Sequence, residues 1–439
     1  MHDRFQGSHG TANAAAVAAF ERAVAAVAAH RPLAGAALDE AIGHDPAFVA
    51  AHALKGFAAL MLGRAELQAP AADAAAAARQ ALRDSASPTR AEETLVRALE
   101  TAVAGRFLAA AGILEARLRL EPLNFLLLKL AQALRFMAGD APGLLAATSS
   151  VLPDWTADAG GAGYVYGCHA FGLEEAGDYH AAERFGELAL ALAPDDAWGL
   201  HAVSHVDEMQ GRIGAGIARL EASRPMWSRC NNFQFHMAWH LALLHLEAGD
   251  AERALEVYDA EVRPQPTDDY RDVANAASLL WRLRLAGIAV GDRWDDLLEI
   301  GRRRARDTTL VFASLHYMLA LAAADDHASA RAALDAWRHA AVRGDGDQAR
   351  TAGDVGLALA AVIAGGDGRR QDYAGIARRL PAIGGSNAQR DVFLQTLAQR
   401  ARDVGDGRAL ADILALRRQV RCSDSFARRM GSTVQHCVA

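Results

Sequence analysis

Cysteine is scarce in this chain. Its 439 residues include four cysteines, with no CxxC pair and no dense spacing. A disulfide framework or a thiolate zinc site needs closely spaced cysteines, so both are excluded as organising features. The scarcity favours a reducing compartment, and we expect a cytoplasmic protein. The four positions are Cys168, Cys230, Cys422 and Cys437.

Long apolar runs and an excess of basic charge are also missing. The first ten residues, MHDRFQGSHG, carry charge and glycine where a secretory signal needs a continuous apolar stretch. No run approaches about 18 apolar residues, the length of a membrane span. The 46 basic and 53 acidic residues are mixed along the chain and give a net charge of −7. The sequence therefore predicts neither a membrane nor a nucleic acid as a partner.

Residues that favour β-strands are sparse as well. Valine, isoleucine, threonine and tyrosine are outnumbered by alanine, and alternating apolar and polar runs are hard to find. This composition favours helix almost everywhere. Because 52% of the residues are apolar, the chain can bury a large core. We therefore predict an all-α globular protein.

A glycine followed by a polar residue and an amphipathic segment recurs between residues 105 and 249. The steps between these glycines alternate between 34 and 38 residues, so a double unit repeats every 72 residues. Glycine adopts the left-handed conformation that commonly ends a helix, which predicts a turn at each position. The five glycines are Gly105, Gly139, Gly177, Gly211 and Gly249.

Proline and alanine follow the same double period. A proline lies 17 residues after every second glycine, and an alanine lies five residues after the same glycine. The prolines are Pro122, Pro194 and Pro266, and the alanines are Ala110, Ala182 and Ala254. A glycine turn, a small residue where two helices cross and a closing proline are typical of tetratricopeptide-like repeats. We predict one solenoid of antiparallel helix pairs, an α-α superhelix, over residues 1–420, clearest in 90–270 and followed by a frayed tail at 421–439.

Weaker signals extend the helical pairs toward the C-terminus. Asp325 stands where a turn glycine would end the helix in LHYMLALAAADD. Ser386 and Gln389 have the spacing of a capping box and predict the start of another helix. We therefore expect helical pairs throughout the chain.

Histidines stand one helical turn apart in the segment HAVSHVDEMQG. His201, His205 and Glu208 are spaced i, i+4, i+7, which places them on one face of a helix. Counted from the turn glycine, these positions line the inner, concave groove of a tetratricopeptide-type superhelix. The segment therefore contributes two imidazoles and a carboxylate to the predicted groove.

The next repeat, FHMAWHLALLHLE, carries a second pair. His236 and His240 are again four residues apart, with Trp239 beside them, and they too occupy groove positions. Neighbouring repeats place His316, Tyr164 and Glu174 on the same side. We therefore treat all of these residues as candidate ligand-binding side chains.

Two such pairs on adjacent helices predict a ligand site, with or without a metal. Imidazole is the commonest neutral metal ligand, and an i, i+4 pair presents two nitrogens to one ion. Three histidines and a carboxylate would leave a position for water, as hydrolytic sites require. The metal candidates are His201, His205, His236 and His240, and the ion would be zinc, iron or manganese. The alternative is that these histidines only satisfy hydrogen bonds between closely packed helices.

Other chemistry has less support. The sequence has no GxxxxGK[ST] loop, GxGxxG fingerprint or GxSxG elbow, so nucleotide binding and serine-hydrolase chemistry lack their usual motifs. Cys168 or Cys230 could act as a nucleophile, although a small buried residue is the more common role. Asp272 and Asn275, three residues apart, could contact the histidine site or cap a helix.

Four segments resemble the tetratricopeptide repeat protein 38 family: HAVSHVDEMQG, FHMAWHLALLHLEAGDAERALEVYD, LAGIAVGDRWDDLL and GGSNAQRDVF. The resemblance runs in register from DPAFVAAHALKGF to GGSNAQRDVF, nearly the whole chain. The family's HxxxHxxE, HxxWH and F…H motifs match, in order, His201, His205 and Glu208; His236, Trp239 and His240; and His316. The resemblance implies a tetratricopeptide-type superhelix. The family has no established biochemical activity, so the resemblance bears on the fold rather than on the function.

Three functions are compatible with these patterns. The first is a binding module whose groove holds a small molecule or a peptide, as repeat solenoids commonly do. The second is a metal-dependent enzyme, hydrolytic or oxidative, in which Glu208 or His205 acts as general base and Trp239 and Tyr164 form pocket walls. The third is a structural scaffold for protein interactions. A homodimer is compatible with each of them.

Overall fold

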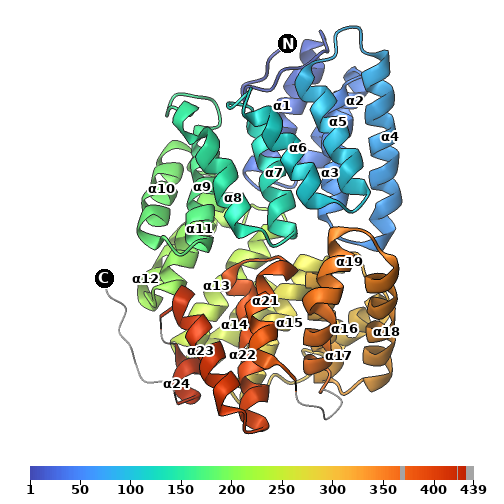
Figure 1. Ribbon diagram of the computed structural model, residues 1–439. Helices are drawn as coiled ribbons and strands as arrows, with labels where there is room; N and C mark the ends of the chain where they lie inside the picture. The colour runs from blue at the N-terminus through green and yellow to red at the C-terminus, as the bar shows by residue number, and fades with distance from the viewer. Residues whose placement is uncertain (366–370, 423, 432–439) are drawn as a thin grey trace. The chain divides into compact units, whose positions relative to one another are not determined.

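The computed structural model describes residues 1–365, 371–422 and 424–431. Regular structure in these ranges is helical, apart from an isolated bridge between His2 and Ser8 (Figure 1). The predicted all-α fold is confirmed. Every helix in the same ranges is too short or too polar to cross a lipid bilayer.

The chain divides into two compact units. One contains Met1–Val203 with Arg229–Asn231, and the other contains Ser204–Ser228 with Asn232–Ala439. The division falls inside one continuous helix, α11 (Ala197–Met209). The single superhelix expected for residues 1–420 stays a prediction.

The first unit consists of helices α1 to α10, the beginning of α11 and two short 3₁₀ helices. These are α1 (Ala14–Ala28), α2 (Ala34–His44), α3 (Val49–Met61), η1 (Ala65–Leu67), α4 (Gln68–Asp84), α5 (Arg90–Val103), α6 (Phe107–Leu118), α7 (Phe125–Met137), α8 (Ala141–Val151), η2 (Leu152–Asp154), α9 (Ala162–Glu175) and α10 (Tyr179–Leu192).

The second unit consists of the end of α11, helices α12 to α24, two π-helical turns (η3 and η4) and one 3₁₀ helix (η5). These are α12 (Ile213–Trp227), α13 (Phe233–Glu247), α14 (Ala251–Val257), η3 (Tyr258–Val262), α15 (Tyr270–Leu285), α16 (Asp295–Arg304), α17 (Val311–Ala323), α18 (His327–Arg343), α19 (Asp347–Thr351), η4 (Ala352–Gly356), α20 (Leu357–Ile363), α21 (Tyr373–Arg379), η5 (Leu380–Ile383), α22 (Asn387–Asp403), α23 (Gly407–Val420) and α24 (Ser425–Arg429).

The predicted turns lie where the glycine spacing places them. The five repeat glycines all have positive φ, between 68° and 85°, and each follows the end of a helix. Asp325 has φ 53° and ends α17 in the same way, so it replaces a turn glycine as expected. The capping box of Ser386 and Gln389 opens α22. Local punctuation therefore sets the helix boundaries.

Consecutive helices lie against one another within each unit, for example α3 with α4 and α9 with α10 (Figure 1). The same holds for α12 with α13 and α22 with α23. The alanines expected at helix crossings, Ala110, Ala182 and Ala254, have no exposed surface. The fold is therefore a tetratricopeptide-like helical solenoid of paired helices.

Helices α13 and α15 are buried on nearly all sides. Every residue of α13 from His236 to Leu244 is buried, and so is every residue of α15 from Asp272 to Leu283. Apolar residues surround both helices, which is typical of a helix inside a core rather than on a surface. Polar side chains on such helices must find partners in the interior, because an unpaired buried polar group costs free energy.

The expected frayed tail is wrong for the described residues beyond 420. Helix α24 is packed into the second unit, where Phe426 is 2% exposed. Asp424 caps this helix, and Glu247 of α13 accepts hydrogen bonds from the backbone N–H and the hydroxyl of Ser425. The sequence beyond 420 is rich in arginine, but these charges have partners in the fold. Residues 432–439 lie outside the described residues.

Four charged side chains form a buried ion-pair network that holds α22, α23 and α24 together. Arg417 donates to Asp391 at 2.7 Å and to Asp424 at 2.6 Å. Arg421 lies 3.0 Å from Asp391 and 3.2 Å from Asp424. Burial opposes ionisation of Asp391, but the two guanidinium groups outweigh it and lower the pKa of this carboxyl.

Replacing one member of this network should destabilise the second unit strongly. We expect Asp391→Ala to lower the free energy of unfolding by about 3–5 kcal/mol, because it leaves buried guanidinium groups without a counter-charge. Asp403→Ala, an exposed position on the same helix, is the matched control and should change it by less than about 0.5 kcal/mol. Urea unfolding measures both. Equal losses for the two variants would contradict the network's structural role.

Candidate functional site

Three imidazoles meet inside the second unit. His205 comes from α11, and His236 and His240 come from successive turns of α13. All three are buried: His205 is 0%, His236 8% and His240 1% exposed. The two helices therefore bring together residues that are more than thirty positions apart in the sequence.

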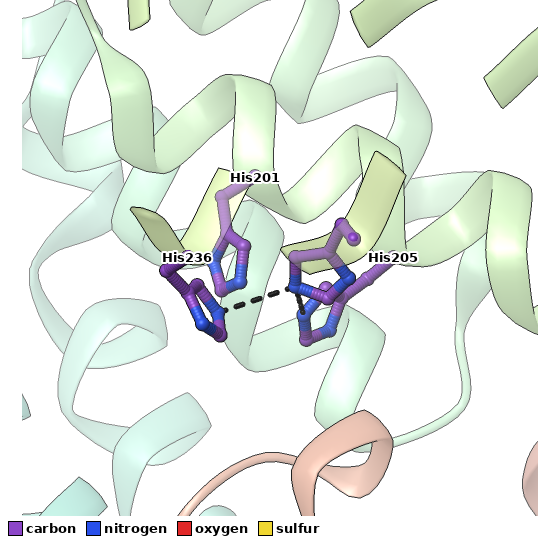
Figure 2. Close-up of side chains that lie close together, drawn as sticks. His201, His205 and His236 are labelled. Carbon is purple, nitrogen blue, oxygen red and sulfur yellow. Dashed lines mark hydrogen bonds between the residues drawn. The ribbon is translucent and has the colours of Figure 1, made fainter. Parts of the chain in front are cut away.

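The three rings present the same nitrogen to one another. Nε2 of His240 lies 3.1 Å from Nε2 of His205 and 3.2 Å from Nε2 of His236. Figure 2 shows His205 and His236 on opposite sides of the histidine cluster, and its dashed lines mark the two Nε2 contacts. Nε2 of His240 thus lies within hydrogen-bond distance of the Nε2 atoms of both other rings.

The outer nitrogens of two rings are bonded to oxygen acceptors. Nδ1 of His236 lies 2.9 Å from the side-chain oxygen of Asn275, and Nδ1 of His240 lies 3.1 Å from Glu208 Oε2. An amide oxygen or a carboxylate only accepts, so each Nδ1 carries the hydrogen and donates it. The Nε2 atoms of His236 and His240 then both carry lone pairs, and neither can donate to the other.

The rings of His236 and His240 are also held in the neutral form. Burial, followed by the neighbouring His240, lowers the pKa of His236 well below its ordinary value. Burial, followed by His205, does the same to the pKa of His240. Neutral imidazole is the form that binds a metal ion.

The spacing suits a tetrahedral ion. Two nitrogens bound at about 2.0–2.1 Å from zinc lie about 3.4 Å apart, close to the separations seen here. Nitrogens of all three rings lie within 4.8 Å of one another. Metal-bound histidines usually donate their other N–H to a carboxylate or a carbonyl. Here Glu208 accepts the Nδ1–H of His240, and the Asn275 side-chain oxygen accepts that of His236.

His201, the fourth metal candidate, stands one turn before His205 on the same face of α11. In the first unit its ring stacks on Phe171, with the centroids 5.5 Å apart, and lies beside Trp198. The role of His201 as a metal ligand stays a prediction.

Helix α15 supports the side chains of α13 through a stripe of polar residues. Asn275 bonds to His236, and one turn later the Ser278 hydroxyl accepts a 3.0 Å hydrogen bond from Trp239 Nε1. Trp239 in turn stacks on His236 and meets His240 edge-on. The orientations of both imidazoles are therefore fixed from outside the cluster.

Glu208 has a different position from the one expected of a general base. One of its oxygens accepts from His240, and the other lies 3.7 Å from Arg421. Both carboxylate oxygens thus face protein groups, and the residue is 5% exposed. This geometry suits orientation of His240 better than proton transfer to a substrate.

Two other predicted ligand residues belong to the first unit. The Tyr164 hydroxyl donates to Asp195 at 2.8 Å, and burial followed by this carboxylate raises the pKa of the phenol. Glu174 is completely buried on α9. Their role in a ligand site stays a prediction.

His316 lies in the second unit but outside the groups of side chains that could share an ion there. Its Nδ1 donates to the Phe312 carbonyl at 2.8 Å, and its ring lies between Phe312 and Phe393. Burial lowers its pKa to about 3. These contacts describe a core histidine.

The cysteine alternative loses support. Cys168 and Cys230 are buried thiols, and burial raises the pKa of both, that of Cys230 to about 11. A nucleophilic cysteine needs a lowered pKa, so neither thiol is activated.

Some residues of the site were missed by the sequence analysis. Ser278 lies on the same buried helix as Asn275, and polar residues recurring in an otherwise apolar helix were the available signal. Arg421 was placed in the expected tail.

No family model matches this chain. Among solved structures, it is similar to that of Naa15/Naa10 bound to HypK-THB, with 14% identity and a TM-score of 0.25 over 92% of this chain. It spans 63% of that chain's length. A second is the P58(IPK) TPR domain, with 14% identity and a TM-score of 0.21 over 81% of this chain and 90% of that one. The resemblance to the tetratricopeptide repeat protein 38 family stays a prediction.

The neutral state of His316 predicts a measurable acid sensitivity. The unfolded chain binds a proton at this residue near pH 6.5, whereas the folded chain does so only near pH 3, so stability is lost as the pH falls between these values. Between pH 7 and pH 5 the loss should be about 2 kcal/mol. We expect His316→Phe to lack this part of the fall in the free energy of unfolding between pH 7 and pH 5. Urea unfolding with a chelator present measures it in both proteins. An unchanged pH dependence would contradict a neutral, buried His316.

Proposed function

We propose that this chain is a helical-repeat metalloprotein that binds a divalent ion, with zinc as the first candidate. The ligands would be Nε2 of His205, His236 and His240, all in the second unit. The observation that supports this most is the convergence of the three Nε2 atoms while Glu208 and Asn275 accept the outer N–H groups of two rings.

The purely structural alternative is less favourable for these rings. Two lone pairs facing each other at 3.2 Å in a buried place repel, because neither nitrogen carries a hydrogen. A cation between them removes the repulsion. A cluster that served only to join helices would be expected to alternate donors and acceptors.

The donor set also bears on the choice of metal. Neutral imidazoles suit zinc, iron or copper, whereas manganese and magnesium prefer oxygen ligands. The proposed ligands in the second unit are three imidazole nitrogens, and this donor set favours zinc or iron over manganese. A zinc ion with three histidines would lower the pKa of a bound water to about 7 and supply hydrolytic chemistry. Glu208 would then be a positioning residue for His240.

The same site also fits the broader proposal of a small-molecule binding module. The imidazoles and Trp239 are almost completely buried, which suits a small ligand better than an extended peptide that needs an open groove. Binding of a peptide or protein partner and a homodimer stay predictions from the repeat fold. The resemblance to the tetratricopeptide repeat protein 38 family is compatible with each of these proposals.

Protein purified without a tag or chelator should contain about one equivalent of metal per chain. His205→Ala and His240→Ala each remove one ligand and should abolish that content, whereas the exposed His180→Ala should keep it. Elemental analysis measures all four proteins. Chelation of the wild type should also lower its melting temperature, because the ion stabilises only the folded state.

Two results would overturn the proposal. One is wild-type protein that takes up no metal after incubation with zinc and iron. The other is metal content that survives in both folded histidine variants. Circular dichroism establishes whether each variant is folded.

The supporting role of Glu208 has its own test. We expect Glu208→Gln to weaken metal affinity about 10–100-fold, because the amide holds the His240 N–H less strongly than a carboxylate does. Competition with a fluorescent zinc chelator measures this affinity. An unchanged affinity would show that Glu208 does not tune the site, and complete loss would instead make it a ligand.

A further inference from the structure

Arg282 is a buried cation without a carboxylate partner. Its side chain is 5% exposed, and its guanidinium donates to two backbone carbonyls, those of Ser278 and Ala388. In the described part of the chain it forms no ion pair. Burial lowers its pKa to about 10, against the attraction of the more distant carboxylates of Asp391 and Glu208.

Arg282 lies beside the histidine cluster. Its guanidinium is 5.4 Å from the centre of the Trp239 ring, the ring that contacts both His236 and His240. On α15 it follows Asn275 by seven residues, so both side chains lie on the same face. The helix that orients His236 therefore also carries the unpaired cation.

Arg282 lines a small cavity together with Glu208, Gln395 and Arg421. The cavity has about 40 Å³ of space for water-sized molecules. One water needs about 10–15 Å³ by this measure, so the space corresponds to about three waters. A carboxylate or phosphate group is of this size.

The acids that face this cavity already have partners. Asp424 pairs with Arg417 and Arg421, and Glu247 accepts from Ser425.

Glu208 accepts from His240 and faces Arg421. Asp391, behind the cavity, pairs with Arg417 and Arg421. Around the cavity, the four acids Glu208, Glu247, Asp391 and Asp424 are matched by four arginines, Arg282, Arg417, Arg421 and Arg429. A divalent ion bound by neutral histidines would add two positive charges to a balanced interior.

We propose that this cavity binds the oxyanion group, carboxylate or phosphate, of a small ligand, with Arg282 as its recognition residue. The inference rests on the proposed metal site, whose added positive charge the anion would offset. A guanidinium presents paired N–H donors that match two oxygens of a carboxylate or a phosphate. The ligand class is therefore a small organic acid or phosphate ester.

The test titrates inorganic phosphate and acetate into cobalt-loaded protein, following heat by calorimetry and the visible cobalt spectrum. Wild-type protein should bind at least one of the anions saturably, and the anion that binds identifies the source. Arg282→Gln should weaken binding at least about tenfold while keeping the cobalt content. The matched control is Arg284→Gln, an exposed arginine two residues along the same helix, which should bind as the wild type does.

Each outcome decides one claim. Cobalt uptake with anion affinity unchanged by Arg282→Gln overturns the role of Arg282 and leaves the metal site intact. Failure of wild-type protein to take up cobalt or zinc overturns the proposed function itself. If Arg282→Gln does not fold, Arg282→Lys keeps the charge but loses the paired donors, and a wild-type affinity in that folded variant counts against the inference.

Discussion

The convergence of buried imidazole nitrogens is the constraint on which the rest of the site depends. Glu208 and Asn275 hold the outer N–H groups of His240 and His236, so the inner lone pairs face one another at hydrogen-bond distance. A buried arrangement of this kind is favourable when a cation accepts those lone pairs. Helix α15 maintains it from behind, because Asn275 and Ser278 fix His236 and Trp239.

The C-terminal helices complete the site from the far end of the sequence. Arg421 faces Glu208, and the same guanidinium pairs with Asp391 and Asp424. A buried pair is costly to break, so this network holds the Glu208 carboxylate in one place. Asp391, Arg421 and Asp424 therefore link folding of the second unit to the position of Glu208, which accepts from His240.

Local sequence patterns predicted what depends on a single helix or turn. The glycine spacing located the turns, and the i, i+4 pairs placed His205 and His240 in one cluster, because both signals follow from helix geometry. Partners from distant helices were not predictable in this way. Arg421 pairs with Glu208 and Asp391, which are far away in the sequence, and its arginine-rich surroundings indicated a frayed tail. His316 occupied a groove position, yet its ring bonds to the carbonyl of its own helix.

The most direct measurement is X-ray absorption at the zinc edge of zinc-loaded protein, combined with anomalous diffraction from crystals. The account predicts an ion about 2.0–2.1 Å from the Nε2 atoms of His205, His236 and His240, with a further light-atom ligand. An ion bound elsewhere on the chain, or a cluster whose rings keep their contacts while no zinc lies between them, would contradict it.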